Sequence, residues 1–589
     1  MDSHQTGKKL TGKVKMWGSL FLFAQLVFAA NNYGPHQIPL LNLVFSEPWI
    51  SAEVNITEGL RHPEHGSVFF VDRSADAGLH SFRRARVNSL KPNYLEVMGG
   101  GVSVGDIDGD GLDDLFFAST PSFDADPEEK ASPSTLFRNM GDGTFKDVTA
   151  EWNLEDIEGY QQGALFFDFN NNGRPDLYIA SYDGGQLYQN EGGYFVDITG
   201  SAGLNLNGLC GDLPCFSSSA SAADYNRDGY SDLLIVNNVD WDIGDPSLYG
   251  ESKLFPAFFK AQQSVLFRNN GDGTFTDVTA ETGVNNEGGK GLSAVWFDFN
   301  NDGWPDVYFA NDLTRNRLYL NNRDGTFREL GAGAMVNEVK SSMGVNTADY
   351  NQNGKFDLIT TNLEGTGISL FRNTEGRFDY ATGYSGLNPS SRSSGWGIEF
   401  VDLNRTGYAD LVMAAGPVWD QNPADAENLF FLNNGEGKFT EASGVAGDFQ
   451  NREVSRGLAV LDADLDGLPD LIFTNIDEGH PQLLMNRSQS DYNWLNLQLE
   501  GIVSNRDAIG ARVVVKRTDD IQLVQEVRAG GSYQSSGTKT LFFGLEHAEV
   551  ETITVNWPSG LISTIVQPSV NQILFIKETA QDENMAVFD

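Results

Sequence analysis

The chain has 589 residues, 40% of them apolar and 11% aromatic, which is enough for more than one domain and for a large buried core. Asp and Glu number 81 against 40 Lys and Arg, so the formal net charge is −41. Nucleic acids and anionic membranes bind patches of Lys and Arg, and we therefore expect neither as a partner of this acidic chain.

Residues 1–30 predict export. Four lysines lie between residues 8 and 15, before an apolar run of 15 residues at 16–30. This order is typical of a secretory signal peptide, and the run is shorter than the about 20 residues that span a membrane. An uncleaved membrane anchor stays open as the alternative, because a second apolar patch follows at 40–45. In both cases we expect a secreted, periplasmic or cell-surface protein, with membrane contact only if the segment is an anchor.

Residues 31–66 carry no repeat and are interpreted as a linker or irregular arm. From residue 106 onward a nine-residue pattern occurs seven times, and its first copy is DIDGDGLDD. Oxygen-bearing side chains stand at positions 1, 3, 5 and 9, and glycine stands at position 6 in all seven copies. We number the copies loops 1–7; they begin at Asp106, Asp168, Asp224, Asp298, Asp349, Asp402 and Asp462.

This pattern is typical of a calcium site. Calcium takes six to eight oxygen ligands at about 2.3–2.6 Å. Alternate side chains of a tightly curled loop can converge on one point, and the glycine permits the sharp turn. Position 7 varies, as expected where only a backbone carbonyl binds. The predicted ligands, for up to seven calcium ions, are Asp106, Asp108, Asp110, Leu112 and Asp114; Asp168, Asn170, Asn172, Arg174 and Asp176; Asp224, Asn226, Asp228, Tyr230 and Asp232; Asp298, Asn300, Asp302, Trp304 and Asp306; Asp349, Asn351, Asn353, Lys355 and Asp357; Asp402, Asn404 and Asp410; and Asp462, Asp464, Asp466, Leu468 and Asp470.

Polar turns between strands are the alternative interpretation of the loops, because Asp, Asn and Gly are the usual turn residues. Seven copies of one gapped pattern favour cation sites. An EF-hand fits less well, since its loop ends in Glu at position 12 before a helix, whereas apolar runs such as DLFFA begin here at position 9. Loops 1 and 7 hold four carboxylates each and loop 6 holds two, so we expect the tightest binding in loops 1 and 7 and the weakest in loop 6.

The segments between the loops predict short strands joined by hairpins. Each DLFFA-like run is typical of a buried strand, and phrases such as LFRNMGDGTF carry hairpin-turn residues. The loops start 51–74 residues apart, a spacing that suits four-stranded propeller blades. We therefore predict an all-β fold in which residues 67–490 form a seven-bladed β-propeller. An unpaired phrase at Phe69 precedes loop 1 and is expected to complete the last blade and close the ring.

The third repeat carries an insertion and the chain's two cysteines. The longest spacing separates loops 3 and 4 and marks an insertion at 239–264 that contains five aromatic residues. A packed flap is favoured over a lid or a partner site. Cys210 and Cys215 are expected to form a disulfide that staples a surface loop in an exported protein, and two free thiols are the alternative.

After residue 490 the repeats stop. Residues 491–579 show alternating apolar positions and turn residues, which predict a second, smaller β-domain, and residues 580–589 are expected to be a disordered tail.

The combined motifs resemble a known family. The loops with LFRNMGDGTF and FKDVT phrases are similar to FG-GAP/VCBS repeats, and the C-terminal NRDAIGARV, GGSYQSSG and WPSG are similar to an ASPIC/UnbV domain. Together, over about residues 67–578, they resemble the cartilage acidic protein family. That resemblance implies a seven-bladed calcium-binding propeller with a β-domain, often exported, whose biochemical activity is mostly undefined. Thr406 at position 5 of loop 6 departs from the pattern, as do the asparagines of several loops.

No catalytic or cofactor-binding residue is predicted. The seven histidines include no pair at zinc-ligand spacing on one element, and neither GxSxG nor a P-loop occurs. Two functions stay open. The favoured one is an exported, non-catalytic binding or adhesion module for a protein or glycan ligand. The alternative is a propeller enzyme, a lyase or hydrolase that acts on polysaccharide in the central channel. A channel mouth lined by two or more of His, Tyr, Arg and Glu would favour the enzyme, since fold alone settles neither.

Overall fold

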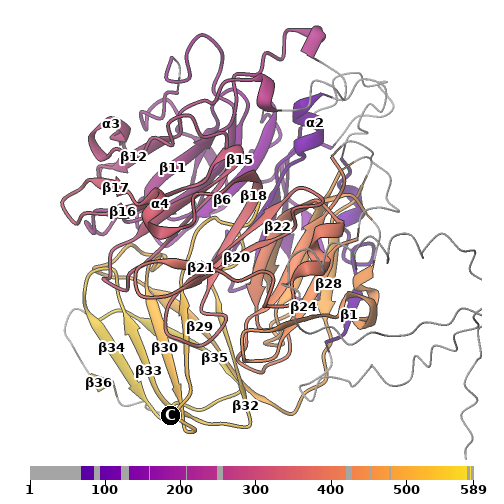
Figure 1. Ribbon diagram of the computed structural model, residues 1–589, viewed down its shortest axis with the longest axis vertical. Helices are drawn as coiled ribbons and strands as arrows, with labels where there is room; N and C mark the ends of the chain where they lie inside the picture. Colours follow the sequence, from indigo (N-terminus) through magenta and orange to yellow (C-terminus); the bar gives the residue numbers. More distant parts are fainter. Residues whose placement is uncertain are drawn as a thin grey trace, which may run out of the picture. The chain divides into compact units, whose positions relative to one another are not determined.

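A computed structural model describes residues 68–579 apart from 85–92, 121–131, 158, 207, 249–255, 419–426, 451–452 and 477–478, together with residues 584–585 (Figure 1). The predicted signal peptide, the arm at 31–66 and most of the predicted tail lie outside the described residues.

Seven four-stranded antiparallel sheets account for the repeats in the described part of the chain. In each sheet the first strand leads into one of loops 1–7, and the second strand begins at position 9 of that loop. We call them repeat sheets 1–7. Their strands are β2 (Val102–Gly105), β3 (Asp114–Phe117), β4 (Thr135–Asn139) and β5 (Phe145–Asp147); β6 (Gln161–Phe167), β7 (Asp176–Ser181), β8 (Gln186–Asn190) and β9 (Phe195–Asp197); β10 (Ser217–Ala223), β11 (Asp232–Asn237), β12 (Val265–Asn269) and β13 (Phe275–Asp277); β14 (Gly291–Phe297), β15 (Asp306–Arg315), β16 (Arg317–Asn321) and β17 (Phe327–Glu329); β18 (Val339–Ala348), β19 (Asp357–Asn362), β20 (Ser369–Asn373) and β21 (Phe378–Tyr380); β22 (Gly395–Val401), β23 (Asp410–Ala415), β24 (Leu429–Asn433) and β25 (Phe439–Glu441); and β26 (Ser455–Leu461), β27 (Asp470–Asn475), β28 (Gln482–Asn486) and β1 (Phe70–Asp72).

The repeat sheets form a closed ring. Their first strands contact one another in the cyclic order β2, β6, β10, β14, β18, β22, β26 and again β2. An apolar cluster fills the space between each pair of neighbouring sheets, including the pair of sheets 7 and 1. Successive side chains of a strand point to opposite faces, and so Phe116 of β3 packs toward sheet 2 while Phe117 packs toward sheet 7. Both faces are buried, which explains the continuous apolar runs and confirms the predicted all-β propeller fold.

The N-terminal strand closes the ring, as predicted from the unpaired phrase at Phe69. β1 pairs with β28 in antiparallel register, with Phe70 opposite Asn486 and Asp72 opposite Leu484. Phe70 is fully buried and its ring lies 5.8 Å from that of Phe449. Residues from the two ends of the repeat array therefore share one sheet. In addition, the ends of β15 and β18 pair with each other and join sheets 4 and 5.

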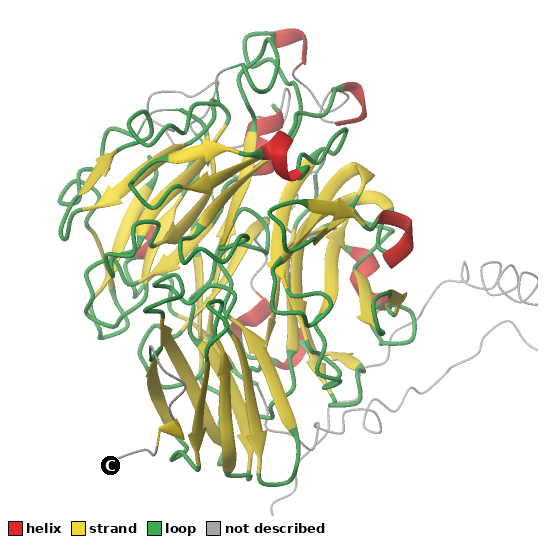
Figure 2. Cartoon of the chain, turned by 90° about the vertical axis from the view of Figure 1, so that its left-hand side faces the viewer, coloured by secondary structure: helices red, strands yellow, loops and turns green. Residues whose placement is uncertain are grey.

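Helices are short and lie between the strands (Figure 2). Those described are η2 (Leu79–Ser81), α2 (Tyr94–Met98), η3 (Pro246–Leu248), η5 (Pro256–Phe258), α3 (Thr279–Thr282), α4 (Gly331–Ala334), η6 (Asn388–Arg392), η8 (Ser443–Val445) and η9 (Asp448–Gln450).

The C-terminal region forms two further sheets around a common apolar cluster. Their strands are β29 (Asn493–Glu500), β30 (Arg512–Arg517), β31 (Gln522–Glu526), β32 (Leu541–Glu546), β33 (Val550–Asn556), β34 (Ile562–Val566), β35 (Gln572–Lys577) and β36 (Asn584–Met585). One sheet has the order β32-β29-β35 and the other the order β31-β30-β33-β34-β36. The last ring strand ends at Asn486 and β29 begins at Asn493, on either side of the expected boundary at 490/491.

A loop of the C-terminal domain enters the ring. Residues 529–536, between β31 and β32, form isolated bridges with the first strands β2, β10 and β18 at Ser103, Ala222 and Val345. The Ser532 hydroxyl extends this contact to β22 and β26, because it accepts the Ile398 N–H at 3.2 Å and donates to the Leu458 carbonyl at 2.8 Å. We call residues 529–536 the inserted loop. It fills the space where the first strands converge, which the sequence analysis treats as a candidate enzyme channel.

The inserted loop meets the short helix α2. Tyr533 is fully buried, donates from its hydroxyl to the Met98 carbonyl at 3.1 Å, and packs against Trp396 with ring centroids 5.0 Å apart. The same apolar cluster contains Trp241 from the insertion at 239–264, and the partly buried Phe259 of the insertion packs against it. The insertion therefore packs onto the ring as a flap where it is described, while Phe258 remains 68% exposed.

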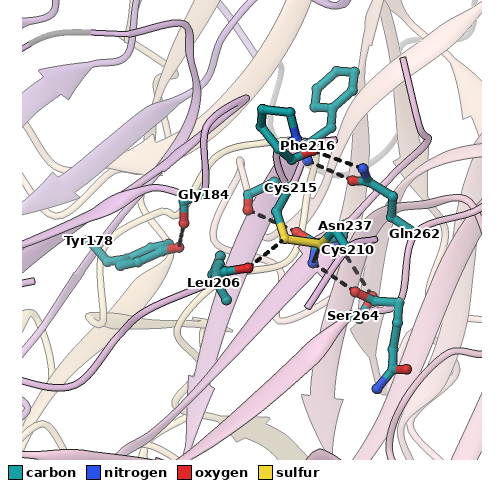
Figure 3. Close-up of a disulfide and its surroundings, with 12 residues drawn as sticks. Tyr178, Gly184, Leu206, Cys210, Cys215, Phe216, Asn237, Gln262 and Ser264 are labelled. Carbon is teal, nitrogen blue, oxygen red and sulfur yellow. Dashed lines mark hydrogen bonds between the residues drawn. A yellow bond between two sulfur atoms is a disulfide. The ribbon is translucent and has the colours of Figure 1, made fainter. Parts of the chain in front are cut away.

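Cys210 and Cys215 form the expected disulfide (Figure 3). The Cys215 sulfur contacts the Leu206 carbonyl at 3.4 Å, and the Asn237 amide donates to the Cys210 sulfur at 3.4 Å. The bond holds the turn before β10 against β11.

Candidate metal centres

The seven loops share one backbone geometry. At position 1 the aspartate accepts hydrogen bonds from the N–H groups of positions 5 and 6, as Asp106 does from Asp110 at 3.1 Å and Gly111 at 2.8 Å. The glycine at position 6 has a φ between 77° and 91° in all seven loops, a conformation that favours glycine and agrees with the sequence prediction. Position 4 also has a positive φ in every loop, although it holds Gly, Asn, Arg, Gln or Leu.

The aspartate at position 9 is a buried structural link in each loop. In loop 1, the Asp114 carboxylate accepts the Ile107 N–H at 3.0 Å and the Asn139 N–H at 2.7 Å. Burial raises the pKa of Asp114 to about 8, and the neighbouring carboxylates of Asp108 and Asp106 add to the shift. The predicted last ligand therefore has a second role, since it ties the loop to the third strand of its own sheet.

An asparagine in each third strand links consecutive loops, a role that the sequence analysis missed. The Asn190 side chain donates to the Ile107 carbonyl of loop 1 at 2.8 Å and to the Pro175 carbonyl of loop 2 at 3.1 Å. The Asn139 side chain does the same between loops 7 and 1, where it reaches the Ala463 carbonyl at 2.8 Å. The signal was in the sequence, as the shared Asn of LFRN, LYQN, LYLN, FFLN and LLMN. The equivalent residues are Asn139, Asn190, Asn269, Asn321, Asn373, Asn433 and Asn486.

Loops 1 and 7 fit a hard cation best. Among the described residues, groups of three carboxylates whose oxygens lie within 4.8 Å of one another occur at Asp106, Asp108 and Asp110 and at Asp462, Asp464 and Asp470. One oxygen of Asp464 is buried without a hydrogen-bond partner. Burial and the neighbouring Asp466 raise the pKa of Asp462 to about 7. A bound divalent cation would relieve this like-charge repulsion, so the donor set is suited to calcium in the two loops with the most carboxylates.

Arginines next to these loops were not foreseen. Arg138 contacts Asp108 at 2.5 Å and Asp110 at 2.9 Å in loop 1. In loop 7, Arg487 contacts Asp464 at 2.6 Å and Asp466 at 2.9 Å. Each guanidinium offsets part of the loop's negative charge. Both are partly exposed, so they can turn outward when a cation occupies the loop.

The predicted ligands of loops 2–5 lie at the same loop positions but are held partly by one another. Asn226 donates to Asp228 at 2.8 Å in loop 3, and Asn300 donates to Asp302 at 2.8 Å in loop 4. At position 7 the backbone N–H donates to the side chain at position 5 in loops 2–5. The Asn351 side chain donates to Asp357 at 2.6 Å in loop 5. The side-chain N–H groups of these asparagines are therefore directed at carboxylates that a bound cation would otherwise contact.

Comparison with known proteins identifies both regions. The family described as FG-GAP-like repeat matches residues 106–179, 168–235, 258–309, 298–360 and 349–413, and the family described as ASPIC and UnbV matches residues 501–583. The chain is an FG-GAP-repeat protein with a C-terminal ASPIC and UnbV domain.

The FG-GAP-repeat protein is similar to cartilage acidic protein 1. It is 24% identical to the Xenopus tropicalis protein over 502 residues and 24% identical to the Homo sapiens protein over 506 residues, which is 82% of this chain in both cases. It spans 65% and 64% of the length of these relatives. Among solved structures it is similar to a lectin of Agrocybe aegerita, with 18% identity, a TM-score of 0.39, and coverage of 60% of this chain and 81% of the lectin. In the described part of the FG-GAP-repeat protein, no helix is long and apolar enough to cross a membrane.

The C-terminal domain of the FG-GAP-repeat protein covers the face that carries the loops. Asp507 accepts the N–H of Asp168 in loop 2 at 2.8 Å. The Thr538 hydroxyl lies 3.1 Å from the Asp113 carboxylate in loop 1, and the Arg512 guanidinium donates to the Gly354 carbonyl of loop 5 at 2.9 Å. Loops 1, 2 and 5 therefore contact the second domain, an arrangement that no local sequence pattern indicated.

A cavity of about 140 Å³ remains between the ring and the C-terminal domain. Glu399 of β22, Glu526 of β31 and Arg528 line it. Burial raises the pKa of Glu399 to about 7 and that of Glu526 to about 8, and the nearby Arg528 opposes both shifts. Arg528 donates to the carbonyl and hydroxyl of Thr347. The mouth of the filled channel thus holds two Glu and one Arg.

Proposed function

We propose that this FG-GAP-repeat protein is an exported, calcium-binding, non-catalytic module that binds or adheres to an extracellular protein or glycan. The observation that carries the proposal is the two clusters of three carboxylates, one in loop 1 and one in loop 7. Both lie in a closed ring whose centre is filled by the inserted loop. A rigid ring presents its outer surfaces to a ligand without a change of shape. The basic segment and apolar run at the N-terminus support export, and the similarity to cartilage acidic protein 1 is compatible with that role.

Calcium would stabilise the ring through its loops. Bound in loop 1, the ion would draw the oxygens of Asp106, Asp108 and Asp110 together and remove their mutual repulsion. The unfolded chain cannot preform such a site, so each site filled at a hundredfold excess over its Kd adds about 2.7 kcal/mol to the free energy of unfolding. Filled calcium sites would therefore raise the stability of the ring and make its binding surface more rigid.

A polysaccharide lyase or hydrolase is the second candidate. The observation in its favour is the cavity lined by Glu399, Glu526 and Arg528, which meets the expectation of a channel mouth with Glu and Arg. Its volume of about 140 Å³ is close to that of a cavity that holds one benzene molecule. Two sugar units on either side of a glycosidic bond need more space, and therefore we favour the binding module.

The first experiment is a thermal melt of the protein in calcium, magnesium and chelator. We expect a higher Tm in calcium than in chelator, and a small effect of magnesium because magnesium demands a tighter octahedron. Asp108→Ala should reduce the calcium-dependent increase in Tm, and Asn404→Ala should leave it nearly unchanged. Identical melts in calcium and chelator would exclude calcium binding by the loops.

The second experiment identifies the ligand. The protein is applied to glycan and protein arrays in calcium and again in chelator, and retained spots are tested for degradation products. Retention without product formation supports a binding module, whereas release of shortened glycans would support the enzyme.

A further inference from the structure

The ligand-position side chains of loop 6 are buried, whereas those at positions 3 and 5 of loop 1 are exposed. The side chains at its positions 1, 3 and 5, Asp402, Asn404 and Thr406, are only 7%, 2% and 1% exposed. In loop 1 the aspartates at positions 3 and 5 are exposed. The cover over loop 6 is strand β32 of the C-terminal domain, whose Glu546 N–H donates to the Arg405 carbonyl at 3.0 Å.

The oxygens of loop 6 are already occupied by hydrogen-bond donors. One oxygen of Asp402 accepts the Gly407 N–H at 2.6 Å and the Gly544 N–H at 3.0 Å. The other accepts the Thr406 N–H at 3.1 Å and the Asn404 N–H at 3.4 Å. A carboxylate offers about four lone-pair positions, so Asp402 has none left for a cation. The Thr406 hydroxyl donates to Asn404 at 2.8 Å, which also engages positions 3 and 5 with each other.

Only glycine can stand where β32 meets loop 6. A Cβ atom at Gly544 would lie 2.0 Å from the Asp402 carboxylate and 2.2 Å from the backbone carbon of Arg405. A Cβ atom at Gly407 would lie 2.7 Å from the Gly544 carbonyl oxygen. Two backbones approach closely here, and both depend on the missing side chains.

The positive charge over loop 6 comes from an arginine. The Arg405 guanidinium lies 5.1 Å from the ring centroid of Trp494 on β29 and donates to the Asp466 carbonyl of loop 7 at 3.0 Å. A guanidinium over an aromatic face is attracted by the ring's negative face. Arg405 therefore connects loop 6, loop 7 and the C-terminal domain.

We propose that loop 6 is a dedicated docking site for the C-terminal domain on the ring, with the Gly544 N–H and the Arg405 guanidinium in place of a cation. This reassigns Asp402, Asn404 and Asp410, which the sequence analysis treats as calcium ligands. The docking part of the proposal stands on hydrogen bonds and close contacts. Its prediction about calcium rests on the proposed function of the other loops.

The test compares matched variants of the full chain in chelator and in calcium. Gly544→Ala leaves loop 6 intact but places a methyl group against Asp402. Asp402→Asn removes the charged acceptor, and Asp462→Asn makes the same change at position 1 of loop 7. For each protein the Tm, the number of calcium ions bound by titration calorimetry, and the proteolysis of the segment 487–492 are measured.

We expect Gly544→Ala and Asp402→Asn to lower the Tm in chelator and to speed proteolysis between the domains, with the number of bound calcium ions unchanged. Asp462→Asn should reduce that number by one. A loss of one ion in Asp402→Asn would show that loop 6 binds calcium and would overturn the proposal. A Gly544→Ala variant that melts and is cleaved like the wild type would overturn it as well.

The two proposals fail in different ways. If the wild type binds no calcium, the proposed function of the loops is wrong, while the docking variants still report a lower Tm in chelator. If calcium binds and the docking variants behave like the wild type, only the assignment of loop 6 is wrong.

Discussion

Single side chains connect the repeats at their buried ends. Each third-strand asparagine donates to two carbonyls from different loops, and each position 9 aspartate accepts two backbone N–H groups. Unpaired polar groups are costly in a buried site. These residues therefore fix the distance between neighbouring sheets more strictly than apolar packing does, because apolar contacts have no direction.

Asn269→Ala should lower the free energy of unfolding by about 1–3 kcal/mol, since it leaves the Phe169 and Ser231 carbonyls without their donor. The neighbouring Asn270 is exposed, and Asn270→Ala is the matched control, with an expected loss below about 0.5 kcal/mol. Urea denaturation of the three proteins in chelator provides the comparison. Equal losses in the two variants would contradict the linking role.

Strand β1 is the element on which ring closure depends. It contributes only three residues, Phe70–Asp72, but it completes sheet 7 and covers the free edge of β28. Phe70 is fully buried while the preceding Phe69 is 47% exposed, so Phe69 offers a matched control of the same residue type.

Phe70→Ala should therefore lower the free energy of unfolding by about 3–5 kcal/mol through loss of buried contacts with Phe430 and Phe449. Phe69→Ala should change it by about 1 kcal/mol or less. Hydrogen exchange locates the effect: amides of β27 and β28 should lose protection in Phe70→Ala before those of sheet 3 do. Uniform loss of protection would contradict a local closure at sheet 7.

The elements that could be predicted from sequence are those with a repeated local signal. The oxygen-bearing loops, the strands beginning with Asp114 or Asp470, and the closing strand at Phe70 each carry a pattern of a few residues. The inserted loop had no such signal, because GGSYQSSG is typical of any polar turn and its partners lie hundreds of residues away in the chain. The Gly544 N–H that takes the place of a cation in loop 6 could not be predicted either, because Gly544 is 142 residues from Asp402 in the chain. Only Thr406 marked that loop as different.

In the whole molecule the ring and the C-terminal domain share a core. Ser532, Tyr533 and Gln534 of the inserted loop are each no more than 1% exposed, although they belong to the smaller domain. We therefore expect that the ring does not reach its full stability without the C-terminal domain. A chain cut near residue 490 would leave the centre of the ring empty.

Tyr533→Ala should lower the free energy of unfolding by about 3–5 kcal/mol, because it removes the aromatic contact with Trp396 and the hydrogen bond to Met98. Tyr533→Phe keeps the ring and should lose about 1–3 kcal/mol. A fragment of residues 1–490 should melt well below the full chain. A fragment that melts like the full chain, or a Tyr533→Ala variant as stable as the wild type, would contradict the shared core.

The cavity between the domains predicts how stability depends on pH. Burial raises the pKa of Glu399 to about 7 from an ordinary 4.5, so the folded state keeps a proton that the unfolded state has lost between these values. Its contribution to stability is fully present below pH 4.5 and is lost as the pH rises through 7. In chelator, the free energy of unfolding should fall between about pH 4.5 and 7, and Glu399→Gln should make that fall smaller.

Exposed Glu436→Gln is the control for this series and should leave the slope unchanged. Urea denaturation at about three pH values in that range gives the slopes. A Glu399→Gln slope equal to that of the wild type would show that Glu399 does not titrate in the folded protein over this range.

The inserted loop also sets the order in which the chain can finish folding. Tyr533 and Met98, which bond to each other, are 435 residues apart. Folding slows as partners become more distant in sequence, because a long loop must be closed before the contact forms. A growing chain has all seven repeats before residues 529–536 are made, so it must wait with an unfilled centre and exposed apolar side chains. We expect this intermediate to depend on chaperones. The N-terminal repeats should become fully stable only after the inserted loop, close to the C-terminus, has been synthesised and has entered the ring.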